Sequence, residues 1–201
     1  MQEECVNHKM SERHLFQVYT APASTVRSNT VWGIREAYDY ITRNPEAMKR
    51  TLELREIIKD VTAGRRDPKE VGKFKTRWFD FATFSGTFSY RKDDGLIRHS
   101  GLLCLDFDDV GGPAELSNLR EWLIHDGHFD TWLLFVSPSG HGLKWVVDID
   151  VSRADHRTWF LAIREYVREV YQTEVDEKCV NVSRACFLPH DGNCYVHPSI
   201  L

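Results

Sequence analysis

Three aspartates within four positions, Asp106, Asp108 and Asp109, close the segment "GLLCLDFDDV". Clustered carboxylates repel one another, so each needs solvent, a cationic partner or a metal ion. Because side chains alternate along a strand, Asp106 and Asp108 share one face while Phe107 points to the other. Two carboxylates in this arrangement can ligate one or two divalent cations. The alternative is that they only end the strand and start the turn toward Gly111.

A loop of small residues, "SPSGHGLK" at 137–144, is the second segment suited to ligand binding. Glycines let backbone N–H groups approach an oxyanion closely, and the two serine hydroxyls and Lys144 add donors for phosphate. The alternative is a simple hairpin turn, for which Pro-Ser-Gly is a sufficient explanation.

A third segment, "VDEKCVNVSRACFLPHD" at 175–191, carries Asp176 and places Arg184 inside an apolar run. An arginine in such a run needs an anionic partner to offset the cost of burial. Asp106, Asp108 and a nucleotide phosphate are the candidate partners at this point.

The order of elements after residue 81 predicts how these segments meet. The expected strands and helices are strand 101–108, helix 114–126, strand 131–137, strand 142–150, helix 153–172 and strand 179–188. This β-α-β-β-α-β order predicts an α+β fold with an RRM-like or ferredoxin-like antiparallel sheet backed by helices. The first and third strands are neighbours in such a sheet, so the acidic strand end and the loop at 137–144 should lie together.

The N-terminal part, 1–80, is expected to be a mostly helical, basic region packed on a core formed by 81–201. A short strand is predicted at 14–20, then helices over 30–44 and from Pro45 to about Asp60, followed by a short basic helix. Residues 49–78 contain ten Lys or Arg and five Asp or Glu, whereas the whole chain has a net charge of -4. Such a basic segment suits a polyanion, although an ordinary solvated helical surface is equally compatible with it. The candidate nucleic-acid-binding residues are Arg65, Arg66, Lys73, Lys75, Arg77 and Trp78.

The bulk composition is that of a globular protein, with 42% hydrophobic and 28% charged residues. No apolar run approaches the roughly 20 residues of a membrane span, and the N-terminus lacks a signal-peptide layout, so we expect a cytoplasmic protein with no membrane partner. Five cysteines in no disulfide-like pattern suggest reduced thiols. A zinc site is a further candidate at Cys179, Cys186, His190, Cys194 and His197, but they contain no C-x-x-C pair, which favours core or loop roles.

The three segments, in this order, resemble the archaeo-eukaryotic primase superfamily. More closely, "HSGLLCLDFD", "SPSGHGLK" and "NVSRACFLPHD", preceded by "FSGTF" at 84–88, resemble the VirE N-terminal domain family found in mobile elements. The resemblance covers about residues 80–195. It implies a primase or primase-polymerase-like domain acting in DNA replication by metal-dependent nucleotidyl transfer. The implied partners are nucleoside triphosphates, a single-stranded DNA template and a helicase or ATPase region in the full-length protein.

The resemblance also implies roles for individual residues. The implied catalytic residues, which are also ligands for Mg²⁺ or Mn²⁺, are Asp106, Asp108 and Asp176. The implied nucleotide-binding residues are Ser137, Ser139, Gly140, His141, Gly142, Lys144 and Arg184.

One departure from the primase pattern keeps three function classes open. The position that usually holds histidine falls on Lys144, with His141 three residues earlier, and lysine does not copy imidazole geometry. A template-dependent nucleotidyltransferase is the first class, and a non-catalytic nucleic-acid-binding module on the same fold is the second. A metal-dependent nuclease or replication initiator is the third. Nucleotide binding that requires metal and Arg184 would separate the first class from the second.

Overall fold

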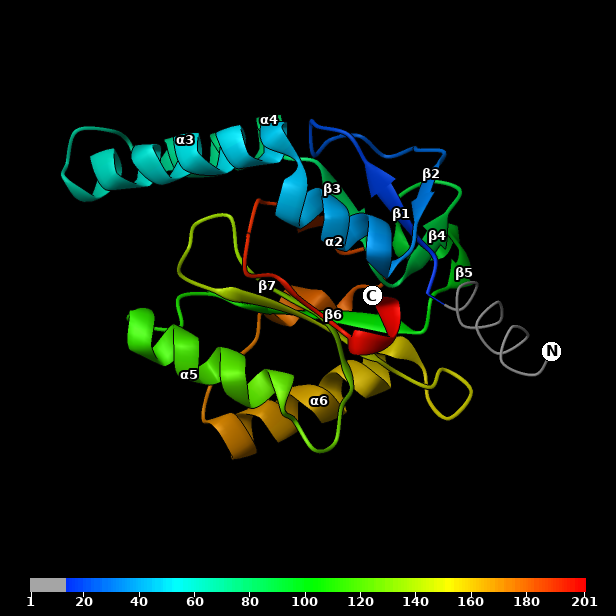
Figure 1. Cartoon of the computed structure of the whole chain (residues 1–201). Helices are drawn as coiled ribbons and strands as arrows, with labels where there is room; N and C mark the ends of the chain where they lie inside the picture. Colours follow the sequence, from blue (N-terminus) through cyan, green and yellow to red (C-terminus); the bar gives the residue numbers. More distant parts are fainter. Residues whose placement is uncertain (1–13) are drawn as a thin grey trace.

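A computed structural model describes residues 14–201, and it is a mixed α+β structure with antiparallel sheets, as predicted. Two four-stranded sheets and a two-stranded sheet form its β-structure. Figure 1 shows helices α5 and α6 on one side of the strands β6 and β7, with α2, α3 and α4 on the other side. No helix within residues 14–201 is both long and apolar enough to span a membrane.

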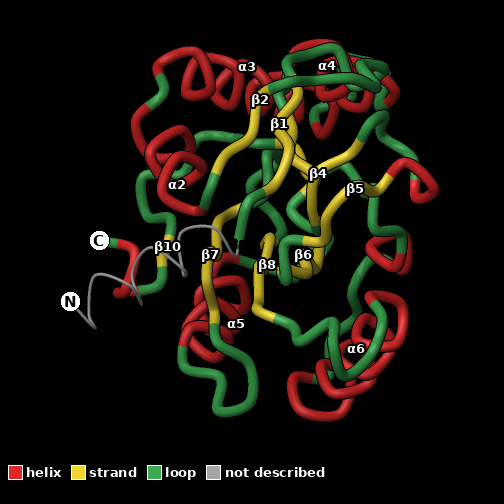
Figure 2. Tube along the Cα trace, turned by 90° about the vertical axis from the view of Figure 1, so that its right-hand side faces the viewer, coloured by secondary structure: helices red, strands yellow, loops and turns green. Residues whose placement is uncertain are grey.

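The sheet that carries the acidic strand end has the order β10-β7-β8-β6, with every neighbouring pair antiparallel. Its members are β6 (Leu102–Phe107), β7 (Thr131–Val136), β8 (Leu143–Asp148) and β10 (Tyr195–Val196). Helix α5 (Pro113–Ile124) connects β6 to β7, and α6 (His156–Tyr171) follows β8. Strand β8 lies between β6 and β7, so the predicted first and third strands are indeed neighbours (Figure 2).

The last predicted strand, 179–188, is wrong over most of its length. Glu177–Val180 is instead the 3₁₀ helix η2, and only Cys186–Phe187 is a strand, β9. The side chain of Asp176 caps η2 by accepting a hydrogen bond from the Lys178 N–H, and a second turn joins Arg184 N–H to the Asn181 carbonyl. These turns interrupt the run, so β9 pairs with another sheet and β10 takes the fourth place beside β7.

The other large sheet has the order β2-β1-β3-β9. Its further strands are β1 (Phe16–Tyr19), β2 (Thr30–Trp32) and β3 (Phe81–Thr83), and the small sheet pairs β4 (Gly86–Phe88) with β5 (Leu96–His99). Because β9 pairs with β3, this sheet includes strands from both sides of residue 80. The proposed division into 1–80 and 81–201 stays a prediction.

The predicted N-terminal helices are present as α2 (Ile34–Arg43), α3 (Pro45–Thr62) and α4 (Lys69–Trp78). The predicted start of the first helix at residue 30 was wrong, because Thr30–Trp32 pairs with β1 as strand β2. Helix α3 begins where expected because Pro45 suits a first turn and the Asn44 side chain accepts a hydrogen bond of 2.9 Å from the Ala47 N–H. The short 3₁₀ helices η1 (Asp93–Gly95) and η3 (Pro198–Ile200) complete the described elements.

Alternation along β6 divides its side chains between two cores. Leu103, Leu105 and Phe107 pack into the core that includes residues of α5 and α6. Leu102 belongs to the other core, together with residues of β1, β3 and α2. Asp106 lies on this second face, so its carboxylate is turned away from α5 and α6 and toward the N-terminal part of the molecule.

Candidate functional site

The structure brings Asp106, Asp108 and Asp176 together. Asp106 is the penultimate residue of β6, Asp108 directly follows that strand, and Asp176 precedes η2. The backbone N–H of Asp176 donates a 2.8 Å hydrogen bond to the Asp106 carbonyl, which joins the two chain segments. One carboxylate oxygen from each aspartate lies within 4.8 Å of the others, close enough for one ion to contact all three. We call these three residues the aspartate cluster.

Two cations compensate part of this negative charge. Lys144 is directly opposite Asp106 in the β6–β8 register, and its Nζ forms an ion pair with Asp106 Oδ2. Nη2 of Arg184 lies 2.7 Å from Asp176 Oδ2. Asp176 was not among the predicted partners of Arg184, so that expectation was wrong: the turns after α6 fold the segment back so that Arg184 meets the aspartate eight residues before it.

The aspartate cluster still has unsatisfied acceptors. Asp106 Oδ1 is buried and has no hydrogen-bond partner, while Asp108 is exposed and forms no ion pair with any residue in 14–201. A buried carboxylate oxygen without a partner is costly, and a divalent cation is a suitable partner for oxygen ligands. A small cavity of about 10 Å³ adjoins Asp106, Lys144 and Arg184, and Asp108 is the exposed member of the aspartate cluster.

Burial shapes the protonation of the central ion pair. It raises the pKa of the Asp106 carboxyl, Lys144 opposes that rise, and Asp108 and Asp176 add to it. Burial disfavours the ammonium form of Lys144, but Cys186 and the Asp106 carboxylate outweigh burial and raise the pKa of Lys144. Lys144 therefore stays protonated, whereas Asp106 takes up a proton more readily than an exposed aspartate does.

The loop between β7 and β8 lies beside the aspartate cluster, as predicted. Its turn is closed by Ser137 N–H bonding to the Gly142 carbonyl and Gly140 N–H bonding to the Ser137 carbonyl, at 2.8 and 2.9 Å. A Cβ at Gly142 would lie 2.1 Å from the Phe107 carbonyl oxygen and 3.4 Å from Asp108 Cα. Glycine is therefore required there by the close approach of the loop to the end of β6.

The predicted nucleotide-binding residues fall into two groups. Ser137, Ser139, Gly140, His141 and Gly142 are on this loop, where the two serine hydroxyls lie 3.0 Å apart and the His141 carbonyl accepts a bond from the Val110 N–H. Lys144 and Arg184 instead face the aspartates, so both cations are already engaged.

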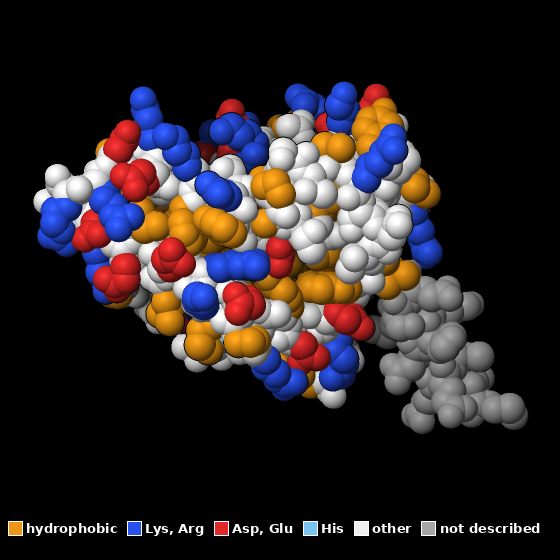
Figure 3. All heavy atoms as spheres, turned by 90° about the horizontal axis from the view of Figure 1, so that it is seen from above, with side chains coloured by type: hydrophobic (Ala, Val, Ile, Leu, Met, Phe, Trp, Pro, Cys, Tyr) orange, Lys and Arg blue, Asp and Glu red, His pale blue; other side chains and the backbone are white. Residues whose placement is uncertain are grey.

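The basic residues predicted to contact nucleic acid also differ from one another. Arg65 and Arg66 both pair with Asp60, at 2.7 and 3.1 Å. On α4, the Arg77 guanidinium lies 5.0 Å from the centre of the Trp78 ring, and Trp78 is 45% exposed. Lys73 and Lys75 form no ion pair within the described chain. Figure 3 looks onto the α3–α4 side and shows Lys and Arg side chains distributed over it, with acidic side chains among them.

Arg55 is a residue of the site that the sequence reasoning missed. It is on α3, is half-buried, and its Nε is shielded from solvent without a hydrogen-bond partner. A Cβ at Gly140 would lie 3.3 Å from this Nε, so the guanidinium rests against the loop between β7 and β8. The sequence contains a signal for this. The positions three and four residues from Arg55 on the helix hold Thr51, Leu52, Ile58 and Lys59, none of which is acidic, so Arg55 has no ion-pair partner at these positions.

The candidate zinc ligands of the cysteine-rich C-terminal segment do not converge on one point. Cys186 and Cys194 belong to one hydrophobic core and Cys179 to the other. Among residues 14–201, the aspartate cluster is the one group of three or more ligand side chains that converge. The interpretation of these cysteines as core residues is confirmed.

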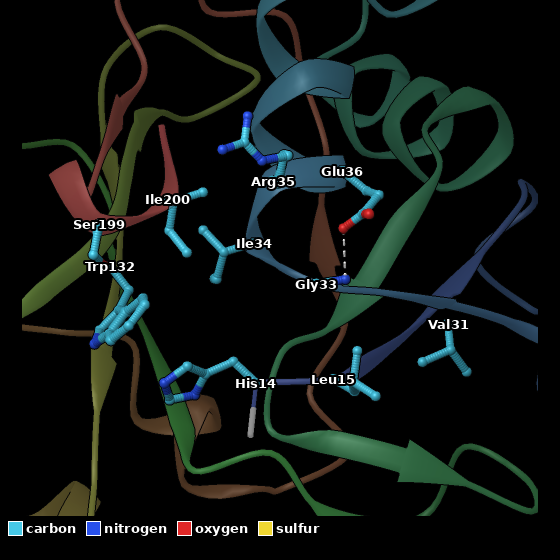
Figure 4. A pocket seen from close by; sticks show the side chains of 10 residues that line it. All are labelled: His14, Leu15, Val31, Gly33, Ile34, Arg35, Glu36, Trp132, Ser199 and Ile200. Carbon is cyan, nitrogen blue, oxygen red and sulfur yellow. Dashed lines mark hydrogen bonds between the residues drawn. The ribbon is translucent and has the colours of Figure 1, made fainter. Parts of the chain in front are cut away.

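A cavity of about 340 Å³ lies elsewhere, between the start of α2 and the C-terminal helix η3 (Figure 4). Its charged side chains, Arg35 and Glu36, form hydrogen bonds within the protein. The Glu36 carboxylate accepts a hydrogen bond from the Gly33 N–H, and Arg35 donates one to the Leu201 carbonyl. The rings of His14 and Trp132 are in contact at one wall, tilted by 53° with their centroids 4.3 Å apart. The cavity offers no cluster of groups comparable to the aspartates.

Comparison with known proteins assigns the chain to a family. No curated protein and no solved structure matches it. The resemblance to the VirE N-terminal domain family and to primases is not tested by these comparisons and stays a prediction. A family model does match residues 73–196, which include the whole aspartate cluster and the loop between β7 and β8. The chain therefore belongs to the BT4734-like, N-terminal domain family.

Proposed function

We propose that this protein binds a divalent metal ion, Mg²⁺ or Mn²⁺, at Asp106, Asp108 and Asp176 and uses it in template-dependent nucleotidyl transfer of the primase-polymerase type. The observation that carries the proposal is the convergence of three carboxylates within 4.8 Å, one of them with a buried, unpartnered oxygen. The resemblance of the surrounding segments to primases supports the choice of reaction. Nucleoside triphosphates would be the substrates and single-stranded DNA the template.

Each part of the site suits a step in handling such a substrate. A bound divalent ion would help to deprotonate the attacking hydroxyl and neutralise the leaving pyrophosphate. Lys144 holds the Asp106 carboxylate in place across the β6–β8 ladder, and Arg184 does the same for Asp176. The Ser–Gly loop is next to the exposed Asp108, where a triphosphate could reach both the loop and the metal.

A second candidate is a non-catalytic nucleic-acid-binding module. The ion pairs of Lys144 with Asp106 and of Arg184 with Asp176 favour it, because two cations already offset two of the three negative charges. In that case the carboxylates would stabilise the fold, and binding would depend on the basic side chains of α4.

Metal-dependent nucleotide binding separates the two candidates. We would titrate a nonhydrolysable nucleoside triphosphate in the presence of Mn²⁺ into the wild type, Asp108→Asn and the control Asp109→Asn. Both aspartates are exposed neighbours, but Asp109 is outside the cluster and has a φ of 49°, a conformation that asparagine tolerates. Loss of binding in Asp108→Asn alone supports nucleotidyl transfer.

Two other outcomes would change the assignment. No metal-dependent binding by the folded wild type would reject the catalytic proposal and leave the nucleic-acid-binding module. Strand scission without added nucleotide would point to a nuclease instead.

A further inference from the structure

We infer that Arg55, contributed by the N-terminal helix α3, is the cation that receives the phosphate tail of the nucleotide. The inference deepens the proposed function and rests on it for the identity of the anion. The primase resemblance assigns Lys144 and Arg184 to phosphate, but both form ion pairs with carboxylates of the aspartate cluster. A phosphate therefore needs another cation.

Arg55 differs from the other arginines of its neighbourhood in having no anionic partner. Arg50 pairs with Asp80, and Arg65 and Arg66 pair with Asp60, whereas Arg55 forms neither an ion pair nor a hydrogen bond within residues 14–201. Holding a half-buried guanidinium with an unpartnered Nε is unfavourable unless an anion completes it. The planar donor arrangement of arginine matches a phosphate well.

The loop between β7 and β8 joins Arg55 to the aspartate cluster. Gly140 is packed against Arg55, and Gly142 is packed against Asp108. Two residues of chain span at most about 7 Å between their Cα atoms, so the Arg55 guanidinium and the Asp108 backbone contact neighbouring positions of one tight turn. Arg55 is therefore placed to meet the far end of a phosphate chain whose other end is held at the aspartate cluster.

His190 supports the same location from a different segment. Its backbone N–H donates a 2.8 Å hydrogen bond to Thr51 Oγ1, one helical turn before Arg55, and its Nδ1 is buried without a partner. The next residue, Asp191, accepts a hydrogen bond from the Val136 N–H at the start of the loop. The segment that carries this second unsatisfied polar group thus contacts both α3, one turn before Arg55, and the end of β7 at the loop.

The test compares Arg55→Gln with Lys49→Gln, which removes the same charge from an exposed position of α3. Calorimetric titrations would use inorganic tripolyphosphate without metal, a nonhydrolysable nucleoside triphosphate with Mn²⁺, the nucleoside monophosphate with Mn²⁺, and Mn²⁺ alone. We expect Arg55→Gln to weaken tripolyphosphate and triphosphate binding by about tenfold or more, since it removes a charged donor. Binding of the monophosphate and of Mn²⁺ should change little, and Lys49→Gln should resemble the wild type.

Equal affinities in Arg55→Gln and Lys49→Gln would overturn the inference. A second contrary result is that Arg55→Gln weakens binding of single-stranded DNA by the same factor as binding of tripolyphosphate. That result would make Arg55 a contact to the nucleic-acid backbone and would overturn the inference. If the wild type shows no Asp108-dependent Mn²⁺ binding but Arg55-dependent binding of tripolyphosphate persists, the anion site stands and the proposed function fails.

Arg55→Lys keeps the test decisive if Arg55→Gln does not fold. Lysine retains the aliphatic stem and the charge but not the forked donors, so it should show a smaller loss in the same two titrations. A wild-type tripolyphosphate affinity in a folded Arg55→Lys would contradict a forked contact with phosphate.

Discussion

The aspartate cluster and helix α4 carry opposite charges, and they differ even more in how that charge is compensated. In the cluster, Lys144 and Arg184 pair with two of the three carboxylates, and the central pair is buried. On α4, Lys73 and Lys75 form no ion pair within the described residues. A basic side chain that forms an ion pair within the protein is less available to bind an anionic ligand than an unpaired one. The number of basic residues in a segment therefore does not by itself predict its capacity to bind anions.

The largest effect should come from breaking the buried pair at Lys144. In Lys144→Met the Asp106 carboxylate loses its cation while both residues are only 8% exposed, so we expect the free energy of unfolding to fall by about 3–5 kcal/mol. Urea unfolding measures this loss. The double variant Lys144→Met/Asp106→Leu removes both charges and should recover most of it; equal destabilisation of the single and double variants would argue against an uncompensated charge.

The pH dependence of metal binding should reveal the burial of Asp106. A metal ligand must be deprotonated, and burial raises the pKa of Asp106, so Mn²⁺ affinity should be complete above that raised pKa and fall as the pH drops through it. The decline should start at a higher pH than for an exposed aspartate. Because Asp108 adds to the rise, Asp108→Asn should shift the decline of any residual Mn²⁺ binding toward lower pH. An unchanged profile would contradict coupling between the two carboxylates.

A smaller effect should distinguish free from paired basic residues. Lys73→Gln/Lys75→Gln should weaken binding of single-stranded DNA and reduce the slope of log affinity against log salt by about 0.7 for each phosphate that is no longer neutralised. The matched pair Arg65→Gln/Arg66→Gln removes the same charge from residues held by Asp60 and should reduce the slope less. Fluorescence anisotropy at several salt concentrations measures both, and equal slopes for the two variants would show that pairing is irrelevant.

The smallest effect should be on stability at the α3–α4 turn. Arg65 is well exposed and its pair with Asp60 is screened by solvent, so Arg65→Gln should change the free energy of unfolding only slightly. Thermal unfolding at low and high salt checks this, and a loss as large as that of Lys144→Met would remove the distinction between surface and buried pairs.

Much of the aspartate cluster could be predicted because local rules determine it. Alternation places Asp106 and Asp108 on one face, and the order of elements brings the loop at 137–144 beside them. The partner of Arg184 could not be predicted, because it depends on turns in a segment whose apolar composition indicates a strand. Likewise β9 and β10 are two residues each, and their places depend on pairing with β3 and β7 rather than on any local pattern.

Arg55 shows a further limit of sequence reasoning. Its helix was predicted correctly, and the lack of acidic neighbours on that helix was readable. Its approach to Gly140, however, requires that α3 pack against a loop more than eighty residues later in the chain. The periodicity of hydrophobic residues predicts a helix but not such a tertiary contact. Tertiary packing, not local pattern, makes this arginine part of the site.

The most direct test of a metal site at the aspartate cluster is a titration with Mn²⁺ in the absence of nucleotide. Binding is measured as the loss of the free-ion signal in electron paramagnetic resonance. The wild type and Asp109→Asn should bind Mn²⁺ with the same affinity. Asp108→Asn loses one of three ligands, so its affinity should fall by at least the roughly 10–100-fold that outer-shell substitutions cost. Equal binding in Asp108→Asn and Asp109→Asn, or none in the folded wild type, would contradict a metal site at the aspartate cluster.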